Sequence, residues 1–153
     1  MELRARLQAA TKEAMKAKDS ARLSTLRLIG AAMRDREIAA RGGDGDGELT
    51  EGDLIVILSR MVKQRQESAK AYEEGGRLEL AAKEEEEIGV IQEFLPRQMS
   101  DAETQAAIGK AIADLDASGI RDMGRVMAAL KDRHAGQMDF GAVGPMVKDR
   151  LLG

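Results

Sequence analysis

The stretch Phe94-Leu95-Pro96-Arg97-Gln98-Met99-Ser100 constrains the fold more than any other part of the sequence. Pro96 has no amide hydrogen and disfavours helical geometry at the residue before it, so a helix arriving from the N-terminal side is expected to end here. Ser100 and Glu103 have the spacing of a capping box, in which each side chain bonds a backbone N–H at the start of a helix. The sequence therefore predicts two helical parts joined by a linker at 96–100.

The composition indicates that both parts are helical throughout. Aromatic residues make up only 2% of the 153 residues, so a core has to be built from aliphatic side chains, Met and Ala. Most of these residue types favour helices, and a charged fraction of 33% suits helices with wide solvated faces. We therefore predict an all-α fold, with an N-terminal four-helix subdomain at 1–95 and a three-helix tail subdomain at 101–153.

Apolar periodicity and capping residues place the individual helices. They are expected at 2–18, 20–41, 51–74, 77–95 and 101–115, followed by two helices capped by Asp122 and Asp139. Asp19 is the expected N-cap of the second helix, and Thr50 with Asp53 has the spacing of a capping box at the start of the third. The run 42–47 consists of glycine and aspartate and is expected to be a mobile connector. Pro145 falls beyond the first turn of the last helix, so this helix is expected either to kink or to begin after Gly144.

The sequence contains no group of residues that is typical of a catalytic site. It has no cysteine, which excludes thiolate nucleophiles and thiolate metal sites. The one histidine, His134, is expected to interact with the negative end of a helix dipole rather than to act as a base. The glycines lack the Gly-Lys-Ser/Thr ending of a phosphate-binding loop. We therefore expect no catalytic residues, no metal and no cofactor.

The sequence also predicts a soluble protein. No apolar run approaches the about 20 residues that cross a bilayer, and Glu2, Arg4 and Arg6 interrupt the pattern of a secretion signal. We expect a cytoplasmic location and no membrane partner. The net charge is −3, so a nucleic-acid site would have to be a local basic patch.

Such a local excess of basic residues is present. Eight Lys and Arg residues lie between Lys12 and Arg41, against four acidic residues in the same segment. If the second and third helices pack side by side, their outer faces can offer a basic strip to RNA phosphates. The run Glu84 to Glu87 can instead neutralise these residues inside the fold, and at least one of its carboxylates is expected to meet a basic residue of a neighbouring helix. Both alternatives remain open.

Four short motifs resemble the YqeY family, in the order in which that family has them. They are Ser24-Thr25-Leu26-Arg27-Leu28-Ile29, Met61-Val62-Lys63-Gln64-Arg65, Leu95-Pro96 with Ser100, and Asp122-Met123-Gly124-Arg125-Val126-Met127. The resemblance spans about Leu3 to Leu151. The YqeY family is in turn similar to the C-terminal region of the B subunit of tRNA-dependent glutamine amidotransferases. This resemblance implies an N-terminal helical subdomain followed by a small three-helix tail, which together help to hold tRNA in the complete enzyme while other domains and subunits carry out the chemistry.

The leading hypothesis is a non-catalytic tRNA-binding accessory domain. Its candidate RNA-contacting residues are Arg22, Arg27, Lys63 and Arg65 in the first part and Arg125, Lys131 and Lys148 in the tail. Because the chain has so few aromatic rings for stacking on bases, it is expected to recognise the backbone and the shape of RNA. A carbon–nitrogen ligase activity with glutamine as amido donor would be inherited from the larger enzyme, because its ATP cradle and glutaminase machinery have no counterpart here.

The alternative hypothesis is a protein–protein interaction module. It would dock through the sixth helix or the acidic fourth helix onto a partner such as an aminoacyl-tRNA synthetase or an amidotransferase subunit. Exposure of Met123 and Met127 would favour docking through the sixth helix, whereas burial would assign both side chains to the core. A third hypothesis, an amidotransferase enzyme, would require the purified chain alone to amidate misacylated tRNA.

Overall fold

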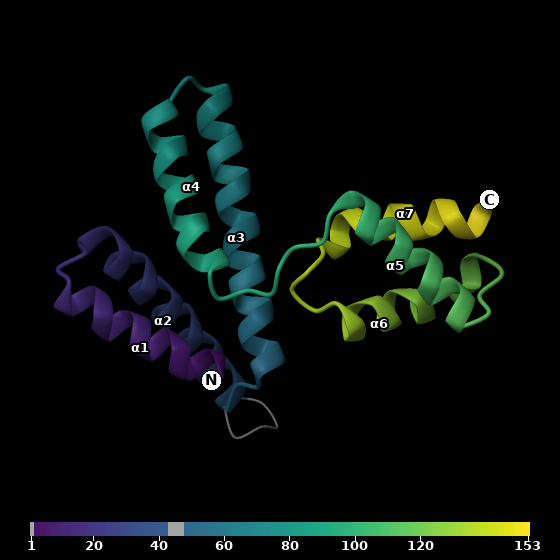
Figure 1. Cartoon of the computed structure of the whole chain (residues 1–153), viewed down its shortest axis with the longest axis horizontal. Coiled ribbons are helices and arrows are strands. Elements are labelled where there is room, and N and C mark those ends of the chain that lie inside the picture. The colour runs from purple at the N-terminus through teal and green to yellow at the C-terminus, as the bar shows by residue number, and fades with distance from the viewer. Residues whose placement is uncertain (1, 43–47) are drawn as a thin grey trace. The chain divides into compact units, whose positions relative to one another are not determined.

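A computed structural model describes residues 2–42 and 48–153 and contains, within these ranges, helices and no strands (Figure 1). The α-helices are α1 (Leu3–Lys16), α2 (Ser20–Arg41), α3 (Glu51–Glu74), α4 (Leu78–Gln92), α5 (Asp101–Asp114), α6 (Met123–Arg133) and α7 (Phe140–Leu152), and the short 3₁₀ helix η1 (Ile120–Asp122) precedes α6. The predicted all-α class is confirmed. Most of the predicted connector at 42–47 lies outside the described residues.

The chain divides into two compact units, Met1–Leu95 and Pro96–Gly153. Each unit has its own hydrophobic core, and the two cores share no residue. The largest fully buried side chains are Ile29, Leu58 and Ile91 in the first unit and Ile108, Val126, Leu130 and Val147 in the second. Phe94 is the one aromatic side chain buried in either core, so aliphatic side chains carry the packing as the composition predicted.

The first unit consists of two helical hairpins, α1–α2 and α3–α4 (Figure 1). Helix α2 packs against both α3 and α4, and α1 packs against α3. The predicted caps form: the Asp19 carboxylate accepts a hydrogen bond from the Arg22 backbone N–H, and Thr50 and Asp53 complete a capping box. Local sequence therefore determines where α2 and α3 begin.

Two helices of the first unit are shorter than predicted because of how they end. Lys18 has a φ of 57°, and the backbone N–H of Asp19 donates to the carbonyl of Ala14, which closes α1 in a Schellman-type turn. Helix α4 ends at Gln92, and the backbone N–H of Leu95 then bonds the Gln92 carbonyl in a tighter turn. The chain therefore leaves helical geometry before it reaches Pro96.

In the second unit, Asp122 does not act as the predicted helix cap. Its carboxylate accepts hydrogen bonds from the backbone N–H groups of Ser118 and Gly119 and pairs with Arg125 at 2.9 Å. The bond from Ser118, followed by that from Arg125, lowers the pKa of Asp122 to about 2. Asp122 thus organises the turn before η1 rather than the first turn of α6.

Helix α7 runs without interruption through Pro145. The expectation that it begins only after Gly144 is wrong, because Asp139 caps the helix by accepting a hydrogen bond from the Gly141 N–H at 3.0 Å. Pro145 is exposed, whereas Val143 and Val147 are buried in the core. The buried face of α7 holds the helix even though Pro145 removes one hydrogen bond.

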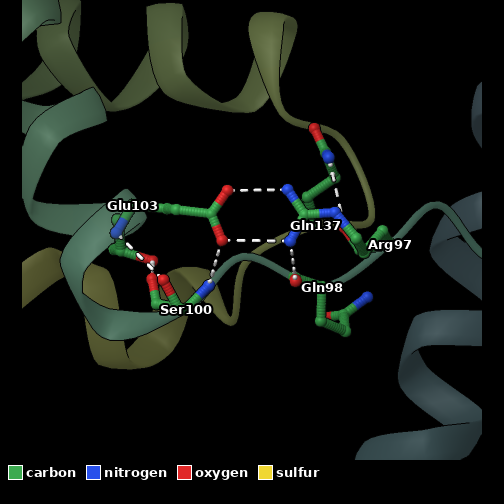
Figure 2. A network of polar contacts seen from close by, with 6 residues as sticks. Arg97, Gln98, Ser100, Glu103 and Gln137 are labelled. Atoms are coloured by element: carbon green, nitrogen blue, oxygen red, sulfur yellow. Dashed lines mark hydrogen bonds and ion pairs between the residues drawn. The ribbon is translucent and has the colours of Figure 1, made fainter.

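Residues 97–99 are bonded to the connection between α6 and α7 (Figure 2). Gln137 donates from Nε2 to the Arg97 carbonyl at 3.1 Å, and the Met99 N–H donates to the Gln137 carbonyl at 3.0 Å. Arg97 also forms a two-bond ion pair with Glu103, whose other role is in the predicted capping box with Ser100. This segment, which we call the strap, is therefore a packed part of the second unit.

Candidate nucleic-acid interface

Three arginines of α2 form an exposed cationic row, which we define as Arg27, Arg34 and Arg41. They are spaced by seven residues, close to two helical turns, so they share one face and follow one another at about 10.5 Å along the axis. None of the three forms an ion pair with another described residue. Their charges are therefore available to an external anion.

A depression of about 260 Å³ lies between α1 and α2, with Arg27 and Arg34 among its lining residues. Buried Leu7 and Ile29 contribute to its apolar floor. Gly30 lies between the two arginines on the same face of α2, and a Cβ added there would have only the Arg34 guanidinium, at 4.0 Å, within contact range. The absence of a side chain at position 30 keeps this part of the depression open.

The acidic group of the depression is already bonded. Arg4 from α1 forms an ion pair with Glu37 from α2, with 2.8 Å between Nη2 and Oε1. The side chains of Arg4 and Glu37 are 35% and 20% exposed, so the pair is partly shielded from solvent. This pair links α1 to α2 and leaves the positive charges of Arg27 and Arg34 uncompensated beside it.

Two of the predicted RNA-contacting arginines instead join helices within the first unit. Arg65 of α3 pairs with Glu87 of α4 at 2.9 Å, and their side chains are only 15% and 19% exposed. Arg22 of α2 pairs with Glu93, which follows α4. The expectation that a carboxylate of the 84–87 run meets a neighbouring basic residue is thus confirmed by Glu87.

The other predicted residues of the first unit lie on its surface. Arg27 is exposed and belongs to the cationic row, whereas exposed Lys63 on α3 interacts with another residue. The structure does not bring Arg22, Arg27, Lys63 and Arg65 together as a row of free charges. Whether any of them contacts RNA stays a prediction.

The predicted tail residues lie on two helices of the second unit. Arg125 bonds Asp122 and the Leu115 carbonyl, while Lys131 on α6 and Lys148 on α7 are exposed and have no ion pair among residues 2–42 and 48–153. Their contacts with RNA also stay predictions. Met123 and Met127 are partly buried and pack against the core of this unit, which assigns them to packing rather than to docking.

The sequence contained a signal for the cationic row that residue counting missed. Arg34 and Arg41 contributed to the local basic excess, but neither was selected as a candidate. Their seven-residue spacing from Arg27 on one predicted helix would have grouped all three. Grouping by helical face is therefore more informative here than the charge count of a segment.

The described part of the chain offers no group of His, Asp or Glu side chains that could hold a metal ion. No helix within that part has the length and apolar character needed to cross a bilayer. His134, the predicted dipole partner, is the C-cap residue that follows α6.

Comparison with known proteins identifies the family. The family model described as "Yqey-like protein" matches residues 4–151, nearly the whole chain. The chain belongs to the YqeY family. The two-unit helical fold described above is therefore the fold of a YqeY member, and the family predicted from the four motifs is confirmed.

Curated relatives of this YqeY protein carry the name "Altered inheritance of mitochondria protein 41, mitochondrial". The relative from Lachancea thermotolerans is 30% identical over 150 residues, which cover 97% of this chain and 78% of the relative. The relative from Vanderwaltozyma polyspora is 36% identical over 84 residues, which cover 55% of this chain and 43% of the relative. The match thus spans less than half of the second relative.

These relatives overturn one expectation from the sequence. A cytoplasmic location was predicted from the absence of a recognisable targeting signal, but both relatives are named as mitochondrial proteins. The prediction of a cytoplasmic location is therefore wrong by this comparison. The prediction rested on the lack of a secretion-signal pattern and of a bilayer-spanning run, and neither feature distinguishes the cytoplasm from a mitochondrial location.

Proposed function

We propose that this YqeY protein is a non-catalytic tRNA-binding accessory domain that holds RNA phosphates along the cationic row of α2. The observation that carries the proposal is the row itself: three exposed guanidinium groups on one helix face, without ion-pair partners in the described ranges. Guanidinium groups suit this role because they bind phosphate oxygens through two parallel hydrogen bonds. The resemblance of the family to the tRNA-holding tail of an amidotransferase subunit supports the choice of tRNA.

The position of the row differs from the strip predicted across the second and third helices. Arg65 and Arg22 have carboxylate partners, so binding them to phosphate would first require these ion pairs to break. Arg27 needs no such exchange, nor do Arg34 and Arg41. We therefore assign the primary phosphate contacts to the row and not to α3.

The test is a titration of fluorescently labelled unfractionated tRNA with the full chain, followed by anisotropy. The variant Arg27→Ala/Arg34→Ala/Arg41→Ala is expected to bind at least tenfold more weakly than wild type, because it loses three phosphate contacts. The matched control is Lys70→Ala/Arg77→Ala/Lys83→Ala, which removes the same charge from the exposed part of the acidic α3–α4 hairpin. Equal weakening in both variants would contradict a role specific to the row.

A second candidate function is docking onto a protein through α4. The observation that favours it is the acidic surface of this helix, where Glu79, Glu85 and Glu86 are exposed and have no ion-pair partner among the described residues. The partner would be an aminoacyl-tRNA synthetase or an amidotransferase subunit with a basic surface. A salt-sensitive complex with such a purified protein, weakened by Glu79→Gln/Glu85→Gln/Glu86→Gln, would support docking, and the absence of a complex would refute it.

We propose that this chain alone carries out no catalysis. A carbon–nitrogen ligase activity with glutamine as amido donor belongs to the multi-subunit enzyme that the family resembles. Amidation of misacylated tRNA by the purified chain, with glutamine and ATP, would overturn the proposal of a non-catalytic domain. We propose that the chain contributes RNA binding and that other proteins supply any chemistry.

A further inference from the structure

We infer that the depression between α1 and α2 seats the base of an unpaired nucleotide, while Arg27 and Arg34 bind the phosphates on either side of it. This inference rests on the proposed RNA binding and names the part of the RNA that is recognised. It concerns the depression that Gly30 helps to line, and not the cationic row as a whole.

The first observation is the position of Gly30. Glycine in the interior of a helix is unfavourable relative to alanine. Packing within the first unit does not require glycine at this position, because an added Cβ would have only the Arg34 side chain, at 4.0 Å, within contact range. The open space above Gly30 therefore suits a group that is not part of this chain.

The second observation is the distribution of charge around that space. Arg27 and Arg34 lie three residues before and four residues after Gly30, so one guanidinium stands on each side of it. Glu37 contributes a carboxylate to the same depression, where Arg4 holds its Oε1. Because this carboxylate already has a cationic partner, the two arginines without partners are the groups that bind phosphates, and the space over Gly30 between them is left for a neutral group.

The third observation is the character of the lining. The floor includes the buried apolar side chains Leu7, Ile29 and Met33, which suit a flat apolar surface and offer no charge to a phosphate. The depression has no aromatic lining residue, but unpaired bases in RNA also stack on arginine guanidinium planes. A neutral, flat base with a phosphate on each side therefore matches the depression better than a continuous duplex backbone does.

The experiment compares two RNA probes that differ only in an unpaired end. One is a blunt 20-base-pair RNA duplex, and the other is the same duplex with three unpaired nucleotides at one 3′ end. Wild type is expected to bind the second probe at least about fivefold more tightly, since stacking of a single base contributes this much or more. Equal affinity for the two probes would overturn the inference and leave the phosphate contacts of the row intact.

The variant Gly30→Leu fills the depression and keeps all three arginines. It is expected to bind the blunt duplex as wild type does and to lose the preference for the unpaired end. The control Gly89→Leu changes an exposed glycine inside α4 that also has no atom within 4 Å of an added Cβ, and it is expected to keep the preference. A Gly30→Leu variant that retains the preference would contradict the inference.

Failure of the proposed RNA binding would give a binding pattern that differs from failure of this inference alone. If wild type binds neither probe, or if the triple arginine variant binds both as wild type does, phosphate binding by the row is refuted and the inference falls with it. If Gly30→Leu does not fold, as judged by circular dichroism, the comparison of the two probes on wild type still decides the inference.

Discussion

Arg65 and Glu87 join α3 to α4 through an ion pair of 2.9 Å whose two side chains are largely buried. The Arg65 guanidinium also donates from Nη1 to the Met61 carbonyl of its own helix at 3.2 Å. A basic residue that looked available for RNA in the sequence is therefore part of the framework of the first unit. The chain uses its arginines in two ways, as internal links and as an exposed row.

The Arg65–Glu87 pair predicts a large effect on stability. Glu87→Ala leaves the Arg65 guanidinium without its partner in a shielded site, so we expect the free energy of unfolding to fall by about 2–3 kcal/mol. Glu86→Ala, at an exposed neighbouring position, is expected to change it by less than about 0.5 kcal/mol. Urea unfolding followed by circular dichroism measures both values. Equal losses of unfolding free energy in the two variants would show that the Arg65–Glu87 pair contributes no more to stability than an exposed glutamate does.

Salt dependence provides a separate prediction for the cationic row. Each phosphate contact releases counterions, so the logarithm of the tRNA association constant should fall linearly with the logarithm of salt concentration. Removal of Arg27, Arg34 and Arg41 is expected to make this slope shallower by about 2 units. An unchanged slope in the triple variant would mean that the three arginines do not contact phosphates.

The strap predicts a response to acid. Hydrogen bonds from Arg97, followed by those from Ser100, lower the pKa of Glu103 from its ordinary value of 4.5 to about 2. A carboxyl whose pKa is lowered in the folded state stabilises that state above the ordinary value, and the stabilisation is lost as pH falls from 4.5 toward 2. The second unit is therefore expected to melt at progressively lower temperature across this range.

The variant Glu103→Gln tests the origin of that response. It removes the titrating group, so the melting temperature should depend less on pH between 4.5 and 2 than in wild type. Asp122, whose pKa is also about 2, leaves part of the dependence in place. Asp101→Asn, which removes an exposed carboxyl from the same first turn of α5 and leaves the Arg97–Glu103 ion pair in place, is the control for the loss of one negative charge there.

Gly30 predicts a gain of stability on replacement by alanine. Gly30→Ala adds a helix-favouring residue where the nearest contact is the Arg34 side chain at 4.0 Å, so stability should rise by about 0.5–1 kcal/mol. Gly89→Ala should produce a similar gain. Thermal unfolding of both variants checks this, and a destabilised Gly30→Ala would indicate that the backbone at position 30 is strained.

Pro145 predicts a gain of stability in the last helix. Pro145→Ala restores a backbone N–H that can donate to the Gly141 carbonyl, and it removes a ring from the interior of α7. Replacing proline also gives the unfolded chain more conformational freedom, which offsets part of this gain. We therefore expect the free energy of unfolding to rise by about 1–2 kcal/mol. A lower melting temperature for the variant would contradict the expectation.

Features set by neighbouring residues were predictable from the sequence. The capping boxes at Thr50 and Ser100 depend on a three-residue spacing, and both form as predicted. The all-α class followed from an aliphatic composition that favours helices. Asp122 shows the limit of such local rules, because its carboxylate bonds the backbone N–H groups of Ser118 and Gly119 and makes no cap hydrogen bond to the backbone of α6.

Features set by packing were not predictable from the sequence. The partners Arg22 and Glu93 lie 71 residues apart, and their contact depends on where α4 ends and how α2 packs against it. The depression above Gly30 requires the relative placement of α1 and α2, which the apolar stripes of single helices do not determine. Sequence reasoning therefore found the basic residues but could not separate those with internal partners from those without.

The strap also determines where this protein can be cut and rejoined. Phe94 is buried in the first core and Leu95 packs against it, while the backbone of Met99 is bonded to residue 137 of the second unit. The natural splice point for a chimaera with a different tail is thus the peptide bond between Leu95 and Pro96. A residue inserted there lengthens the tether, whereas the same insertion next to Met99 would disrupt the hydrogen bond between the strap and the connection from α6 to α7.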